Sequence, residues 1–203
     1  MQQPKKGAVK FQRLRFGCLI IIFVLFIGSA PAFCQKSETI EGTARGTSTQ
    51  AGQTFGFRLI IQDYSSPEDR QILVQAFQKG QNQGLVNALS KMRAVGHISL
   101  TGTLGYDVSY IRVIPTATGR KIRFVTNRPI TVAEAWTDSL SQAYNLSGGE
   151  IDMNEQDKSK STGVLYPAAM LNIDKEGQLQ IDLNQNPWTI VDVLDWKGTP
   201  GVN

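Results

Sequence analysis

Short segments in which apolar and polar residues alternate make up most of the chain, and this period of two is typical of β-strands with one buried face. The clearest covers residues 55–64, where every second residue from Phe55 to Ile61 is apolar. We expect further strands at residues 97–101, 106–114, 120–126, 149–154, 163–173, 178–183 and 188–196. About eight or nine short strands joined in sequence predict one mainly antiparallel fold, either a β-sandwich or a partly closed β-barrel.

One stretch, residues 66–96, shows a helical period instead. Ser66 is a good N-cap and Pro67 a good first helical residue, while Gly80 indicates a stop halfway. Apolar residues recur on one side of each half: Ile72, Leu73, Ala76 and Phe77, then Leu85, Ala88, Leu89 and Met92. We therefore expect an α+β fold in which a two-helix insertion, about residues 66–95, packs on the sheet.

Two of the predicted strands should form a hairpin around the loop 115–119. With Thr116 opposite Gly119, the apolar face carries two cross-strand pairs: Ile111 with Phe124, and Val113 with Ile122. An error of one residue in the loop length would move every side chain to the other face.

The other face of this hairpin sets Arg112 opposite Arg123, with Lys121 on the diagonal and Tyr110 beside them. Two arginines facing each other are unfavourable unless an anion or a carboxylate compensates their charge. These four residues are therefore a candidate site for a carboxylate, a phosphate or an acidic surface. The alternative, which we favour, is compensation by carboxylates from the acidic carboxy-terminal half of the chain.

The last strand carries an apolar face that Asp192 interrupts, formed by Trp188, Ile190, Leu194 and Trp196. Tryptophans on a strand can form a platform for a sugar or an apolar ligand, but core packing is their more common role. We expect core packing here.

The amino terminus predicts export. Five basic residues precede an uncharged apolar run at residues 16–30, and small residues follow it. This order is typical of a secretory signal peptide, residues 1–34, with cleavage after Ala32 or Cys34. An uncleaved anchor at residues 16–30, holding the protein in the inner membrane, is the alternative. Residues 35–203 would then form a single β-rich domain in the periplasm or outside the cell.

Removal of the leader changes the charge balance. Residues 35–203 carry 16 Lys and Arg against 17 Asp and Glu, a net charge of −1. The positive charge of the whole chain therefore comes from the leader and does not indicate a nucleic-acid partner. Residues 35–128 have a net charge of +6 and residues 129–203 a net charge of −7. We expect the two halves to lie against each other and neutralise much of this field.

The sequence offers little catalytic chemistry. It has one histidine, His97, no G-x-S-x-G motif, no phosphate-binding glycine loop and no zinc-ligand spacing, and both cysteines lie before residue 35. We expect no metal, no cofactor and no disulfide in the mature protein. A carboxylate pair could still act in hydrolysis, but we expect the candidate carboxylates to be solvated strand residues: Glu150, Asp152, Asp192 and Asp195.

Three runs, PEDRQILVQAFQKGQNQGLVNALSKM, GRKIRFVTNRPI and NQNPWTIVDVLDWKG, resemble a group of exported bacterial β-rich proteins without assigned activity. The resemblance covers most of the chain after residue 38 and implies export and a single domain, but it carries over no functional residue. We therefore expect a non-enzymatic binding or interaction module of the cell envelope, whose partner is an envelope protein or a small anionic or apolar ligand. The alternative is a hydrolase or isomerase of small ligands or glycans that uses His97 or a carboxylate pair.

Overall fold

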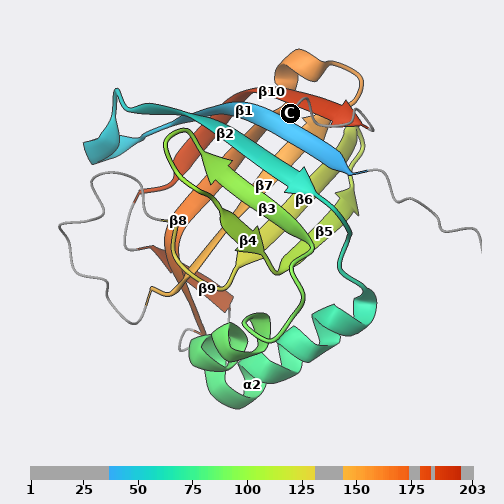
Figure 1. Cartoon of the computed structure of the whole chain (residues 1–203), viewed down its shortest axis with the longest axis vertical. Helices are drawn as coiled ribbons and strands as arrows, with labels where there is room; N and C mark the ends of the chain where they lie inside the picture. The colour runs from blue at the N-terminus through green and yellow to red at the C-terminus, as the bar shows by residue number, and fades with distance from the viewer. Residues whose placement is uncertain (1–36, 131–143, 174–178, 184–185, 198–203) are drawn as a thin grey trace, which may run out of the picture. The chain divides into compact units, whose positions relative to one another are not determined.

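The computed structural model describes residues 37–130, 144–173, 179–183 and 186–197, all of them within a unit that spans residues 35–203 (Figure 1). The predicted signal peptide, residues 1–34, lies outside the described residues.

The strands of the described residues form one antiparallel sheet, in the order β4-β3-β2-β1-β10-β8-β7-β6-β5, with β9 paired to β8. Their bounds are β1 Glu38–Arg45, β2 Thr54–Ile61, β3 Gly96–Leu100, β4 Tyr106–Val108, β5 Tyr110–Pro115, β6 Gly119–Thr126, β7 Leu146–Asn154, β8 Thr162–Ile173, β9 Leu179–Leu183 and β10 Trp188–Lys197. Two short 3₁₀ helices join them, η1 at Ser48–Gln50 and η2 at Lys158–Lys160.

The sheet curls into a nearly closed barrel because its two edge strands, β4 and β5, are consecutive in the chain and only Ser109 separates them. β4 pairs with β3 and β5 pairs with β6. At the junction, the Ser109 N–H donates to the Val125 carbonyl oxygen of β6 at 3.2 Å. The prediction of a mainly antiparallel fold is therefore confirmed in outline, and of its two alternatives, a β-sandwich and a partly closed barrel, the structure is the barrel (Figure 1).

Side chains fill the interior of the barrel. Fully buried apolar residues come from almost every strand, among them Ile40, Leu59, Ile98, Ile111, Ile122, Phe124, Ile151, Leu165, Trp188 and Ile190. Burial of each such side chain contributes about 1.5 to 3 kcal/mol. The core thus holds the barrel together, and the candidate sites lie at its end and on its surface.

The predicted hairpin register is confirmed. In β5 and β6, Ile111 lies opposite Phe124 and Arg112 lies opposite Arg123. The Thr116 N–H donates to the Gly119 carbonyl oxygen at 3.0 Å, which closes the loop as the sequence predicted. Ile111 and Phe124 point into the core, so Arg112 and Arg123 face outward.

The helical segment is one element, α2 (Pro67–Leu89), and the predicted two-helix insertion is not shown. The Ser66 side chain accepts a hydrogen bond from the Asp69 N–H at 3.1 Å, and Asp69 accepts one from the Ser66 N–H at 2.8 Å. The break at Gly80 and Gln81 bends the element without ending it, because only these two residues leave helical geometry. A second apolar cluster covers its buried side: Leu73, Leu85 and Leu89 with Leu146.

A β-bulge in β10 reverses which residues face the barrel interior. Asp192 and Val193 lie opposite the single residue Gly42 of β1, and Asp192 has a positive φ of 55°. Before the bulge Trp188 and Ile190 are buried; after it Val193 is buried, whereas Leu194 and Trp196 are 55% and 45% exposed. The predicted shared face of these apolar residues is therefore wrong, because the extra residue shifts the alternation by one.

Candidate functional site

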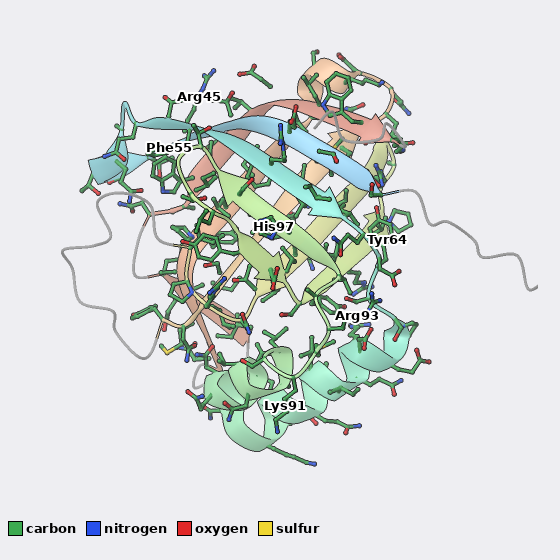
Figure 2. All side chains as sticks on the ribbon, viewed as in Figure 1. Arg45, Phe55, Tyr64, Lys91, Arg93 and His97 are labelled. Carbon is green, nitrogen blue, oxygen red and sulfur yellow. The ribbon has the colours of Figure 1, made fainter. Side chains whose placement is uncertain are left out.

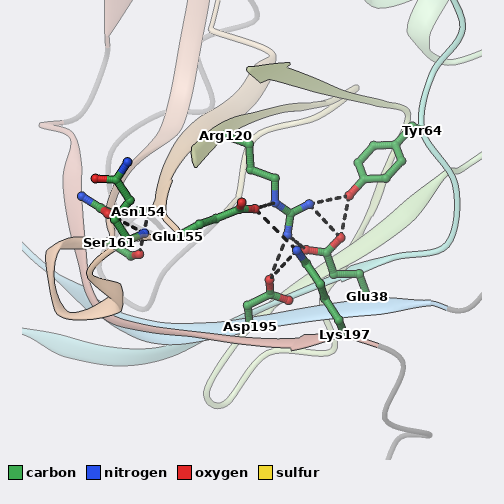
Figure 3. A network of polar contacts seen from close by, with 9 residues as sticks. Glu38, Tyr64, Arg120, Asn154, Glu155, Ser161, Asp195 and Lys197 are labelled. Atoms are coloured by element: carbon green, nitrogen blue, oxygen red, sulfur yellow. Dashed lines mark hydrogen bonds and ion pairs between the residues drawn. The ribbon is translucent and has the colours of Figure 1, made fainter. Parts of the chain in front are cut away.

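Charged side chains from β1, β6 and β10 gather in one layer of the barrel (Figure 3). Glu38 is the first residue of β1, Arg120 the second of β6, and Asp195 follows the bulge in β10. Each of the three strands continues into the core with residues on the same inward face: Ile40, Ile122 and Val193. The side chains of Arg120, Glu38 and Asp195 are only 14%, 11% and 13% exposed.

Arg120 joins the two carboxylates (Figure 3). Its Nη1 donates to Glu38 Oε2 at 3.1 Å and its Nη2 to Asp195 Oδ2 at 2.9 Å, while Nη2 also donates to Glu38 Oε1. Tyr64, which follows β2, donates its O–H to Glu38 Oε2 at 2.6 Å. Both oxygens of Glu38 are therefore satisfied, and the guanidinium group bridges β1 and β10.

Two more charges lie beside this layer. Lys197 Nζ lies 3.7 Å from Asp195 Oδ2 and 3.6 Å from Glu155 Oε1. Arg120 Nε is 3.5 Å from the same Glu155 oxygen but makes no hydrogen bond to it. With every group ionised the five side chains carry three negative charges and two positive ones. The excess negative charge favours uptake of one proton.

The two buried carboxyl groups differ in acidity. Burial raises the pKa of Glu38, but the hydrogen bonds from Arg120 and Tyr64 outweigh it and the pKa lies below its usual range. Burial and then the charge of Glu38 raise the pKa of Asp195, and Arg120 and Lys197 offset only part of that rise. Asp195 is therefore the carboxyl that takes up a proton first.

This difference predicts how stability depends on pH. Ionised Asp195 lowers the free energy of unfolding at neutral pH, and this cost disappears as the pH falls through its raised pKa. Ionised Glu38 raises the free energy of unfolding, and this stabilisation is lost at lower pH, as the pH falls through its depressed pKa. An Asp195→Asn variant should therefore gain stability relative to the wild type as the pH rises from about 4 to about 7. Urea unfolding across this pH range measures the difference in the free energy of unfolding between variant and wild type, with Asp192→Asn as the control. A difference that does not change with pH would contradict the raised pKa.

A cleft of about 610 Å³ opens beside the charged layer, between the end of β7, η2 and the end of β10. Its lining includes Asp195, Glu155, Lys158, Ser161, Lys197 and Met153. The buried Oδ1 atom of Asp195 has no hydrogen-bond partner among the described residues. Such an atom costs free energy unless a donor satisfies it, which marks Asp195 as the residue of the cleft lining that a hydrogen-bond donor would stabilise.

The structure separates the residues of the predicted anion site. Lys121 Nζ lies 2.5 Å from Glu150 Oε1, and Arg123 Nε lies 2.5 Å from Glu150 Oε2. Glu150 belongs to the acidic half, so the favoured alternative of internal compensation describes these two cations. Arg112 and Tyr110 instead line a different cleft.

The other candidate residues lie apart from the charged layer. His97 is on β3, where its Nδ1 is 3.4 Å from Asp107 Oδ1 and its Nε2 is 3.3 Å from the Leu104 carbonyl oxygen (Figure 2). Asp192 is exposed and lies 3.3 Å from Arg45. The expectation that Asp195 is a solvated strand residue is wrong, because the bulge turns it inward. The interruption of the apolar pattern at Asp192 was the signal for that bulge.

Among the described residues no group of three His, Cys, Asp or Glu side chains is placed to hold a metal ion. No helix of the described part is long and apolar enough to cross a membrane. A comparison with protein-family models, with curated proteins and with solved structures finds no match to this chain.

Proposed function

We propose that the protein is an exported, non-enzymatic binding module of the cell envelope, and that the cleft between β7, η2 and β10 is its ligand site. The predicted signal peptide supports export. The observation that carries the binding site is at Asp195, which lines the cleft of about 610 Å³ and whose buried Oδ1 lacks a hydrogen-bond partner among the described residues. Apolar side chains fill the interior of the barrel, so we place the ligand in this surface cleft and not inside the barrel.

The lining of the cleft favours a small saccharide. Asp195 and Glu155 can accept hydrogen bonds from hydroxyl groups, and Lys158 and Lys197 can donate to hydroxyl oxygens. Leu194 and Trp196, both about half exposed, add an apolar patch against which the C–H face of a sugar ring can pack. A ligand with hydroxyl groups on its edge and an apolar face meets both requirements.

The test is a titration of the purified protein with a panel of mono- and oligosaccharides, followed by two-dimensional NMR. Binding should shift the backbone signals of β10 and of the segment 153–161, and Asp195→Asn should weaken it about tenfold, the value of one charge-assisted hydrogen bond. Asp192→Asn, the exposed carboxylate of the same strand, is the matched control and should bind like the wild type. Absence of any shift in the cleft, or equal loss in both variants, would remove the proposal.

One observation favours acid catalysis as a second candidate. The pKa of Glu38 is lowered and that of Asp195 is raised. Such a difference is common in carboxyl pairs in which one group acts as the acid and the other as the base. Asp195, with the raised pKa, would donate the proton to a bound glycan. Release of new reducing ends on incubation with the same saccharides, abolished by Asp195→Asn, would replace the binding proposal with a hydrolase.

A further inference from the structure

A second cleft, of about 420 Å³, lies on the outside of the barrel between the start of α2 and β5. Its lining includes Tyr64, Ser65, Arg70, Tyr110 and Arg112. Two hydrogen bonds fix its wall: the Ser65 N–H donates to the Ile111 carbonyl oxygen at 2.9 Å, and the Ile111 N–H donates to Ser65 Oγ at 3.0 Å. These bonds hold the segment before α2 against β5 before any ligand binds.

Arg70 and Arg112 differ from the other arginines of the described residues. The other six each have a partner: Arg45 with Asp192, Arg58 with Glu41, Arg93 with Asp63, Arg120 with Glu38, Arg123 with Glu150, and Arg128 with the ring of Tyr106. The side chains of Arg70 and Arg112 have no ion pair, hydrogen bond or ring contact within the described part of the chain. Both line the same cleft.

The charges around Arg112 leave it uncompensated. It lies directly opposite Arg123, and Glu150 is already shared between Arg123 and Lys121. In the first turn of α2, Asp69 accepts a hydrogen bond from the Ser66 N–H, and Glu68 does not line the cleft. An anion bound to Arg112 and Arg70 would offset the repulsion between Arg112 and Arg123.

We propose that this cleft binds the phosphate or carboxylate group of an anionic ligand between the guanidinium groups of Arg70 and Arg112. A guanidinium group matches two oxygens of such a group with parallel hydrogen bonds, and two of them recognise a phosphate better than a single lysine would. The partly buried ring of Tyr110 borders the site. The inference does not depend on the saccharide proposal, because no residue lines both clefts.

The experiment titrates the purified protein without its predicted leader, residues 35–203, with inorganic phosphate and follows the backbone signals by NMR. Phosphate should shift the signals of residues 64–70 and 110–113 and leave those of β10 unchanged. Arg70→Gln and Arg112→Gln should each weaken binding at least about tenfold. Arg45→Gln removes the same charge from an exposed ion pair outside the cleft and should change the affinity less than twofold.

A second measurement separates the possible sources of the anionic group. The same proteins are mixed with vesicles of phosphatidylglycerol or of phosphatidylcholine, and co-sedimentation is measured. Binding to the anionic vesicles that Arg112→Gln abolishes assigns the site to a lipid headgroup, whereas phosphate binding without co-sedimentation assigns it to a free anion. The inference is overturned if neither probe binds, or if Arg45→Gln weakens binding as much as Arg112→Gln.

Discussion

Replacement of Arg120 by Met is expected to lower the free energy of unfolding by about 3 to 5 kcal/mol, the usual cost of leaving a buried charge without its partner. Arg120 is the cation that holds Glu38 and Asp195 at the end of the barrel. Without it, two buried carboxyl groups face each other with only Lys197 nearby. Urea unfolding at neutral pH, followed by tryptophan fluorescence, measures the change.

Arg123→Met is the matched control, because Arg123 lies on the same strand but its side chain is 55% exposed. It makes an ion pair with Glu150, and loss of such a surface pair should cost less than about 1 kcal/mol. A second variant, Arg120→Met with Glu38→Gln, should recover part of the lost stability because it removes one of the stranded charges. Equal costs for Arg120→Met and Arg123→Met would show that the buried layer contributes no more than a surface pair.

Deletion of Leu194 is expected to cost more than about 3 kcal/mol, although its side chain is half exposed. If the bulge is kept, the deletion turns Asp195 away from Arg120. If the strand becomes regular instead, Asp192 enters the interior in place of Val193. Either outcome breaks the charged layer or buries a new unpaired carboxylate.

Deletion of Asp192, two positions before Leu194 on the same strand, is the matched control for the deletion of Leu194. It removes the extra residue of the bulge and leaves Val193 and Asp195 on the inward face, so its cost should stay below about 2 kcal/mol, including the exposed pair with Arg45. Thermal unfolding of both variants measures the difference. If the two deletions cost the same, the alternation in β10 does not determine the position of Asp195.

Local patterns predicted the parts of the fold that depend on neighbouring residues. The hairpin of β5 and β6 was predicted to the residue, because a short loop and an alternating apolar face allow only one register. The start of α2 was predicted because Ser66 and Pro67 are strong local signals. Helical structure on both sides of Gly80 was also predicted, but not that the two parts form one element with a kink at Gly80 and Gln81, because a glycine can bend a helical segment as well as end it.

The candidate sites were harder to predict, because they join residues that are far apart in the sequence. Arg120 lies 82 positions from Glu38 and 75 from Asp195, and no local spacing connects the three. The sequence predicted that Arg112 would need compensation, but not that Glu150 would serve Arg123 and Lys121 only. Arg70 had no distinguishing signal, since no local pattern connects it to Arg112, which lies 42 positions later in the chain.

The pairing of β1 with β10 also has a consequence for how the barrel folds. Glu38 pairs with Lys197, so β1 and β10, the first and last of these strands in chain order, can pair only after the residues between them have been brought together. Contacts of such high sequence separation carry a large loop-closure entropy and slow folding to the range of milliseconds to seconds. The seam between β1 and β10 is therefore expected to form last, and substitutions there to speed unfolding while the folding rate stays nearly unchanged.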